Sequence, residues 1–304
     1  MKNIFTYSTA FVLGLALLAT PEADAQQFSK RKQYNSVGFS LNAMNYFGDI
    51  TPVTNFTSFR FGATRAGAGI SYTRRFYPRV SGRLGLSYGR ISGDDEKAAD
   101  QNSPDARYRY NRNFAFRNDI IEASAVVIFD LIENRNNYLK RPDFVPYVFA
   151  GVAGFYHSPE GLVREGAPGG LSEGSYVPLV DLRTEGQAKA YSQTQFAIPF
   201  GGGVRYRVNR NFDASLEIGW RKTFTDYLDD VGGTFADPAK LTTPVQQYFG
   251  GGITKLQGPG TPYPGFTNPG EARGDKGGKT DWYIVTGVTL SYILTPRIKN
   301  PKFR

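Results

Sequence analysis

The chain has 304 residues, of which 40% are apolar and 21% charged, so it can build at least one core. It contains no cysteine and a single histidine, which excludes disulfides, thiolate catalysis, cysteine-bound metals and multi-histidine metal sites. The formal net charge is +9, without the clustered Lys/Arg run of a nucleic-acid patch, so anionic lipid phosphates fit this charge better. The 35 Gly, 23 Phe and 19 Tyr favour a β architecture.

Residues 1–25 have the organisation of a secretory signal peptide. Lys2 gives a positive start, residues 11–19 form a short apolar segment, and Ala23-Asp24-Ala25 is a small-x-small cleavage site. The apolar segment is far shorter than the roughly 20 residues that a membrane-spanning helix needs. We therefore expect export, cleavage after Ala25 and a single mature domain over residues 26–304.

Apolar and polar residues alternate with a period of two through most of the mature chain, which is typical of β-strands with one apolar face. No later segment has 18 consecutive apolar residues. The pattern predicts strands at about 34–47, 67–77, 80–91, 118–131, 145–157, 196–208, 212–221 and 282–292.

The connections between these expected strands alternate in length. Those after the second, fourth and sixth strands are short, whereas those after the first, third, fifth and seventh are long. A soluble β-sandwich or lipocalin would also alternate in polarity, but short turns at one rim and long loops at the other indicate a transmembrane barrel. The sequence predicts an all-β, eight-stranded antiparallel outer-membrane β-barrel with short periplasmic turns and long extracellular loops.

The polar parity of the strands predicts the content of the lumen. An eight-stranded barrel has little room beyond its own side chains, so these charges should interlock and leave no open channel. The expected charge network consists of Arg75, Arg83, Glu122, Asp130, Arg205, Arg207, Asp213, Glu217 and Arg221. On the apolar parity, Trp220, Trp282 and Tyr292 are expected in aromatic girdles at the membrane interfaces.

Two groups of residues resemble chemical sites but favour simpler interpretations. His157, Ser158 and Glu160 offer the residue types of a lipid hydrolase, yet consecutive strand residues point to opposite faces. Asp226, Asp229, Asp230 and Asp237 offer oxygen ligands for calcium, but they lack the EF-hand spacing and read as solvated loop charge. We therefore predict no catalytic site, no metal site and no cofactor.

The loop at about 232–280 is rich in Gly, Pro and Thr, including the segment 257–266. Such a composition is typical of chain that does not pack a core, and we expect it to be mobile or ordered by a partner.

Two segments at the long-loop rim resemble the signature segments of a known family. They are Asn45-Tyr46-Phe47-Gly48-Asp49-Ile50 and Thr223-Phe224-Thr225-Asp226-Tyr227-Leu228-Asp229-Asp230-Val231. We expect the acidic residues to cap backbone at the rim and the aromatic residues to anchor it at the lipid headgroups. This rim motif comprises Tyr46, Gly48, Asp49, Asp226, Tyr227, Asp229 and Asp230.

The family that these segments resemble is an uncharacterised outer-membrane barrel family of Bacteroidota that includes PorG-type components of the type IX secretion system. The resemblance implies a non-enzymatic anchoring or assembly component of such a system. Its partners would be outer-membrane lipids, lipopolysaccharide and periplasmic ring proteins, with no nucleic acid. The periplasmic link 132–144 and the basic tail 296–304 are the expected protein contacts. A free-standing structural or adhesive barrel and a lipid-modifying enzyme are the alternatives.

Overall fold

The structure is a computed structural model that describes residues 32–50, 61–99, 102, 107–252, 256–258, 261–262, 269–274 and 280–295. The expected signal peptide (1–25) and the whole basic tail (296–304) lie outside these residues. Among the described residues, no helix has both the length and the apolar character required to cross a membrane.

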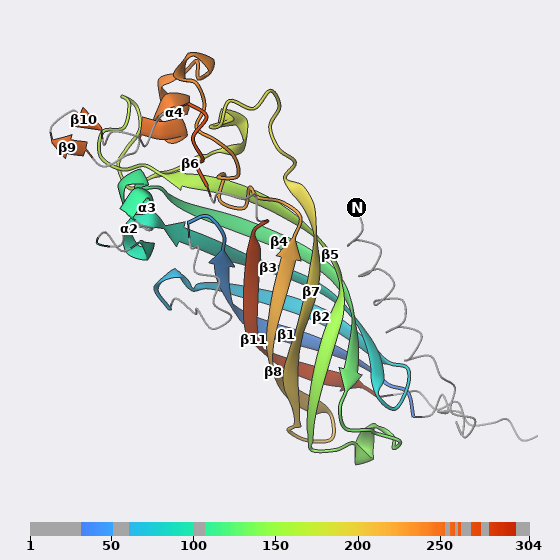
Figure 1. Cartoon of the computed structure of the whole chain (residues 1–304). Helices are drawn as coiled ribbons and strands as arrows, with labels where there is room; N and C mark the ends of the chain where they lie inside the picture. Colours follow the sequence, from blue (N-terminus) through green and yellow to red (C-terminus); the bar gives the residue numbers. More distant parts are fainter. Residues whose placement is uncertain are drawn as a thin grey trace, which may run out of the picture.

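Eight long antiparallel strands form a closed barrel (Figure 1). They are β1 (Asn35–Phe47), β2 (Arg65–Arg75), β3 (Val80–Asp94), β4 (Ala115–Asp130), β5 (Phe144–Leu162), β7 (Thr194–Arg207), β8 (Phe212–Thr223) and β11 (Trp282–Leu294). Each strand pairs with the next along the chain, and β1 pairs with β11 to close the barrel. The predicted fold class is therefore confirmed, and the period-two runs placed all eight strands.

The two ends of the barrel differ as the loop lengths predict. Residues 76–79, 131–143 and 208–211 make the connections at one end, here called the short-turn end. Asn35 of β1 lies opposite Leu294 of β11, so the chain enters and leaves the barrel at this same end. The opposite end, here called the long-loop end, carries the connections after β1, β3, β5 and β8.

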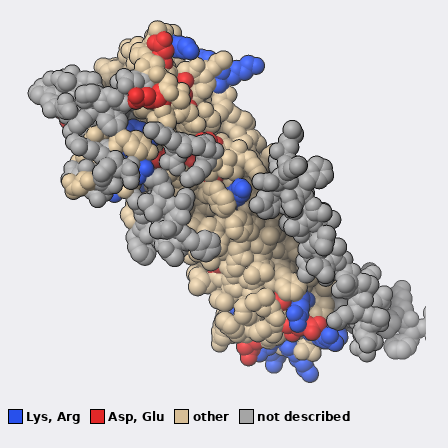
Figure 2. All heavy atoms as spheres, viewed as in Figure 1, with Lys and Arg blue, Asp and Glu red and all other residues tan. Residues whose placement is uncertain are grey.

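The outside of the barrel carries a belt of exposed apolar side chains. The outward-facing residues include Val37, Phe39, Leu41, Ile70, Leu84, Leu86, Val127, Val148, Val152, Leu216, Val288 and Leu290. On the face shown in Figure 2, charged residues gather at the two ends, and the surface between them is almost free of charge. An apolar belt around a polar interior is the reverse of a soluble barrel and is the arrangement of a membrane-spanning one.

One side of the barrel wall continues past the long-loop rim. β2 pairs with β3 only as far as Gly89, whereas β3 stays paired with β4 to Asp94 and β4 with β5 to Gly161. Residues 90–94, 115–120 and 157–162 therefore form a raised wall, roughly 20 Å tall at the usual rise of a strand. The short strand β6 (Tyr176–Pro178) pairs with the upper part of β5. The fifth strand thus extends five residues beyond its predicted end.

The long loops fold against the inner side of this raised wall. We call their described residues the cap: 95–99, 107–114, 163–193, 224–252 and 269–274. The cap contains the short helices α2 (Asp95–Ala98), α3 (Arg107–Arg112) and α4 (Pro244–Gln247), the 3-10 turns η3 (Val180–Leu182) and η4 (Pro238–Lys240), and the π-turn η5 (Tyr248–Gly252). The remaining small elements are η1 (Phe61–Ala63), η2 (Tyr138–Lys140) and the pair β9 (Leu256–Gly258) and β10 (Thr261–Pro262).

A hydrophobic core joins the cap to the raised wall. It includes Ile91, Phe116, Ile120 and Phe155 from the strands and Val163, Leu179, Leu228, Val231, Tyr248 and Phe249 from the cap. The expectation that residues 232–280 pack no core was therefore wrong for Tyr248 and Phe249, which are buried. Two adjacent aromatic residues provide enough apolar surface for a Gly-rich loop to dock. Residues 259–260 and 263–266 of the Gly/Pro segment lie outside the described residues.

The backbones of β4 and β5 lie so close at Gly151 that there is no room for a side chain. A Cβ atom at this position would lie 2.1 Å from the backbone oxygen of Ala125 and 2.6 Å from the Cα of Val126. We expect Gly151→Ala to cost about 1–3 kcal/mol of unfolding free energy, because the backbones must separate. Gly154→Ala on the same strand is the matched control, since its Cβ would meet only Phe196, at 3.9 Å. Urea unfolding in lipid vesicles measures both, and equal stabilities would contradict the contact.

Candidate functional site: the plugged lumen and the folded cap

One buried carboxylate pairs with two arginines in the lumen near the short-turn end. Asp130 Oδ2 accepts hydrogen bonds from Arg75 Nη1 at 2.9 Å and from Arg205 Nη2 at 2.6 Å. Asp130 and Arg75 are both fully buried. Since a lone buried charge is costly, the shared partner holds β2, β4 and β7 together across the lumen.

Two further groups fill the lumen toward the long-loop end. Glu217 pairs with Arg83 and accepts a 2.5 Å hydrogen bond from Tyr147 Oη. Above it, Glu122 accepts from Arg221 Nε at 3.2 Å and from Tyr283 Oη at 2.6 Å. These side chains come from strands on opposite sides of the barrel, so their contacts run across the lumen and occupy it.

The space that remains in the lumen is small. A cavity of about 80 Å³ lies between Arg83, Glu122, Glu217 and Arg221, and another of about 40 Å³ lies beside Arg75, Arg205 and Asp213. Volumes of this size hold a few water molecules and no solute. The described lumen is therefore a network of ion pairs and hydrogen bonds rather than a channel.

Arg141 closes the short-turn end. Its guanidinium donates to Asp213 Oδ1 at 2.7 Å and to the backbone oxygens of Tyr138, Asn209, Arg210 and Phe212. Asp213 thus pairs with a loop residue that the strand pattern did not reveal. Arg207, the last residue of β7, lines the short-turn end of the lumen beside Arg205 and Asp213, and it pairs with the exposed Asp143 at 2.5 Å.

The two rim segments meet at the long-loop end. Tyr46, at the end of β1, donates to Asp229 and also lies 2.8 Å from Asp281 Oδ1. A Cβ atom at Gly48 would lie within 2 Å of both Asp281 Oδ1 and Tyr46 Oη, so only glycine allows this approach. The expectation that Tyr46 anchors the rim in lipid headgroups was wrong, since Tyr46 is 2% exposed and lies inside the barrel mouth.

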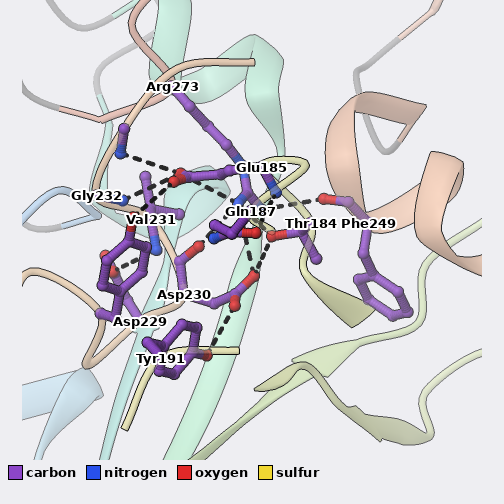
Figure 3. A network of polar contacts seen from close by, with 12 residues as sticks. Thr184, Glu185, Gln187, Tyr191, Asp229, Asp230, Val231, Gly232, Phe249 and Arg273 are labelled. Atoms are coloured by element: carbon purple, nitrogen blue, oxygen red, sulfur yellow. Dashed lines mark hydrogen bonds and ion pairs between the residues drawn. The ribbon is translucent and has the colours of Figure 1, made fainter. Parts of the chain in front are cut away.

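Arg273 organises the centre of the cap (Figure 3). It is 2% exposed and donates to Thr184 Oγ1 at 2.7 Å, to the Asp230 backbone oxygen at 2.7 Å and to the Phe249 backbone oxygen at 3.0 Å. Its Nη1 also lies 3.4 Å from Glu185 Oε1 and 3.5 Å from Asp230 Oδ2. One side chain from the end of the last loop therefore ties together the loops after β5 and β8.

Burial, outweighing the opposing charge of Arg273, raises the pKa of Asp230 to about 6. Thr184 and Tyr191 donate to its carboxylate at 2.5 and 2.7 Å. Tyr227 stacks on Tyr191 with ring centroids 4.7 Å apart. The interpretation of Asp229 and Asp230 as solvated loop charge was therefore wrong, because the cap buries both completely.

The structure does not bring together the residues of either candidate chemical site, the hydrolase-like group at His157 or the calcium-like acidic group. Among the described residues, no three acidic or histidine side chains are grouped to hold a metal ion, and Asp237 caps η4 instead. His157 is fully buried against Phe155 and Tyr191, while Glu160 pairs with Arg117 at 2.5 Å. His157 and Ser158 lie on consecutive positions of β5, so their side chains point to opposite faces.

The expected girdle residues occupy the two edges of the apolar belt. Trp220 and Trp282 lie toward the long-loop end, where both pack against Phe200, and Lys222 lies 5.6 Å above the Trp282 ring. Tyr292 packs against Phe212 toward the short-turn end, with ring centroids 5.2 Å apart. These positions lie about ten strand residues apart, which matches the thickness of a bilayer crossed by tilted strands.

A closed eight-stranded barrel with an apolar belt, aromatic edges and a polar interior defines the class: this chain is an outer-membrane β-barrel. Residues 24–241 match the family described as "Domain of unknown function (DUF6089)", and the chain belongs to that family. No curated protein matches the chain.

Several solved outer-membrane barrels are similar to the chain at low identity. The N-terminal barrel domain of Pseudomonas aeruginosa OprF is 14% identical, covering 86% of this chain and 99% of that one, with a TM-score of 0.33. Neisserial surface protein A is 13% identical (85% and 96% covered, TM-score 0.36), and OprG from Pseudomonas aeruginosa is 10% identical (88% and 98% covered, TM-score 0.39). At these scores the likeness carries nothing about function.

Removing the central arginine should loosen the cap and spare the barrel. We expect Arg273→Ala to speed proteinase K cleavage of the cap about tenfold, because Asp230 and Glu185 lose their buried partner. Heat-modifiable gel migration should persist, since β1 to β11 stay paired. Arg183→Ala is the control, as Arg183 is an exposed arginine of the cap, next to Thr184 in the loop after β5. Equal cleavage of native chain and Arg273→Ala would show that Arg273 does not hold the cap.

Proposed function

We propose that this chain is a non-enzymatic, non-conducting outer-membrane barrel that anchors or assembles a protein complex, of the PorG-like type IX secretion kind. The observation that carries the proposal is the plugged lumen: ion pairs cross it at three levels and Arg141 closes the short-turn end. The packing of the lumen argues against transport through the barrel and favours an activity at its two ends. The short-turn end faces the periplasm, as in other outer-membrane barrels.

The short-turn end has the chemistry of a protein-binding surface. Large apolar side chains are exposed at Tyr77, Ile132 and Leu139, beside the exposed cations Arg135 and Lys140. Charged side chains also gather at this end in Figure 2, with Lys and Arg prominent. Apolar anchors surrounded by positive charge suit a partner with an acidic surface, which is how a periplasmic ring protein would bind.

This surface is held rigidly. Arg141 ties the 131–143 loop to the turn between β7 and β8, and Asn137 caps the short helix η2 by accepting from the Leu139 N–H at 3.1 Å. A loop ordered before binding loses less entropy when a partner docks, so it favours affinity. The loop is the 132–144 segment expected to contact the periplasmic partner.

Lipids are the second proposed partner. Lys222 above Trp282 places a positive charge at the edge of the apolar belt. A lysine at this depth can reach the phosphates of lipopolysaccharide while its stem stays on the aromatic ring. The belt and girdles then hold the barrel at a fixed height in the membrane.

A free-standing structural or adhesive barrel is the alternative, and the folded cap favours it. The cap presents an ordered surface above the membrane, joined by the Arg273 network. In that case the ligand would bind at the long-loop end, and the short-turn end would have no partner.

Co-purification from native membranes after mild crosslinking separates the two functions. We expect native chain to recover periplasmic ring proteins, and Arg135→Glu with Lys140→Glu to lower that recovery about tenfold, because charge reversal repels an acidic surface. Arg183→Glu with Lys189→Glu, two exposed charges at the long-loop end, is the matched control. A barrel that purifies alone, with secretion intact after its deletion, would contradict the secretion role.

A further inference from the structure

Three buried acidic groups and one phenol meet where the cap joins the barrel. Tyr46 Oη lies 2.6 Å from Asp229 Oδ2 and 2.8 Å from Asp281 Oδ1. Asp229 and Asp281 are fully buried, and Asp49 is 3% exposed beside them. Tyr46 belongs to β1, Asp229 to the loop after β8, and Asp281 immediately precedes β11. The group therefore connects the cap to two strands of the barrel.

If both carboxyl groups were ionised, this group would contain too few hydrogens for its two short contacts. A phenol has one hydrogen and can donate to only one of the two oxygens. The other oxygen of each carboxyl group already accepts a backbone hydrogen bond: Asp229 Oδ1 from Val231 N–H and Asp281 Oδ2 from Leu228 N–H, both at 2.9 Å. The second short contact at Tyr46 Oη therefore requires a proton on Asp229 or Asp281, which donates to the phenol oxygen.

The surrounding charges favour this extra proton. Arg112 approaches from α3, but its guanidinium donates to both oxygens of Asp95 and to the backbone oxygens of Asp49 and Arg273. Asp230 and Glu185 face Arg273 on the other side of the loop. Burial, reinforced by the negative charge of Asp49, raises the pKa of both Asp229 and Asp281 well above the usual carboxyl range.

We infer that Asp229, Tyr46 and Asp281 share one proton, and that this proton is a pH-sensitive latch that holds the cap on the barrel. With the proton present, the three side chains form a continuous chain of hydrogen bonds from cap to β1 to β11. Without it, two carboxylates lie buried across one phenol with no arginine donating to them in the described structure. Alkaline pH should therefore release the cap, while the strand pairing below remains.

The direction of the pH effect follows from the raised carboxyl pKa. Such a group favours the closed cap while it is protonated, and this contribution declines as the pH rises from the ordinary carboxyl value toward the raised one. Burial also raises the pKa of Asp230, to about 6, and comparison with the Asp281→Asn variant, which keeps Asp230, separates the latch from this second carboxyl group. Each unit by which the shared pKa is raised corresponds to about tenfold in the closing equilibrium.

Asparagine at one latch position copies the protonated state permanently. In Asp281→Asn the amide oxygen can accept from Leu228 N–H, and the amide nitrogen can donate to Tyr46 Oη, which then donates to Asp229. Asp229→Asn is the mirror arrangement. We therefore expect both variants to keep the cap closed at pH values that open the native cap, whereas Tyr46→Phe should open it already at pH 7.

Thiol labelling measures the opening cleanly, because the chain has no cysteine of its own. Val163→Cys is the reporter, since Val163 is a cap residue that is 1% exposed in the core between the cap and the raised wall, and it lies outside the latch. The barrel is refolded into lipid vesicles and labelled with a maleimide at a series of pH values from pH 5 to pH 9.5. We expect the labelling rate to rise with pH about tenfold more in the native background than in the Asp281→Asn background. The thiol's own pH response is the same in both backgrounds, so it cancels in this comparison.

Three outcomes would overturn the latch. Equal pH responses in the native and Asp281→Asn backgrounds would show that no shared proton controls the cap. Faster labelling of Asp281→Asn at pH 7 would show that Asp281 serves only as an anion, and Asp229→Asn tests this separately should Asp281→Asn fail to fold. A rise in labelling of Val145→Cys, which is buried near the short-turn end, that is as much larger in the native than in the Asp281→Asn background as the rise of Val163→Cys would show that the whole barrel unfolds instead.

Discussion

Replacing Arg141 with alanine is expected to cost about 3–5 kcal/mol of unfolding free energy. Asp213 would lose its buried partner, and four backbone oxygens of the short-turn end would lose a donor. Urea unfolding in lipid vesicles, followed by the fluorescence of Trp220 and Trp282, measures this loss.

Arg135→Ala is the matched control for Arg141, in the same loop. Arg135 pairs with Glu133 but its side chain is 74% exposed, so its removal should change stability by less than about 1 kcal/mol. If both variants lost the same stability, Arg141 would be an ordinary surface residue. The short-turn end would then lack the rigid surface that the proposed function requires.

Val288→Lys, a substitution in the middle of β11, is expected to cost about 2–4 kcal/mol of unfolding free energy. Val288 faces outward on the apolar belt and is 57% exposed, so in a bilayer the charged group would lie in hydrocarbon. The same vesicle unfolding experiment measures the cost.

Phe224→Lys separates a membrane barrel from a soluble one. Phe224 is 56% exposed, as Val288 is, but it lies just beyond the end of β8 at the long-loop rim. Water would tolerate lysine at both positions, whereas a bilayer penalises only Val288. Equal and small effects at the two positions would contradict the membrane-spanning belt.

The strands could be predicted from the sequence because each one repeats a two-residue pattern. Phe212 to Trp220 alternate with Asp213 to Arg221, and this fixes both the strand and the face of each side chain. The pattern also predicts that the inward charges interlock, but only the fold shows the partners, Glu217 with Arg83 and Glu122 with Arg221.

The cap could not be predicted in the same way, because no periodic pattern marks a loop residue as buried. Arg112, Arg141 and Arg273 look like surface arginines in the sequence, yet each is nearly fully buried among backbone oxygens and one or more carboxylates. Asp281 was missed because it stands alone before a strand. The rim segments were recognised as distinctive, but only the fold shows that Tyr46 and Asp229 contact each other across 183 positions.

Single-channel recording tests the central claim, a plugged barrel that acts through its ends. Purified barrel is refolded into a planar lipid bilayer, and heat-modifiable migration confirms that it is folded. The ion pairs that cross the lumen and the small cavities between them predict a flat baseline with no discrete current steps. Regular steps of constant size from the native chain would contradict the account, because they would require a continuous water path through the lumen.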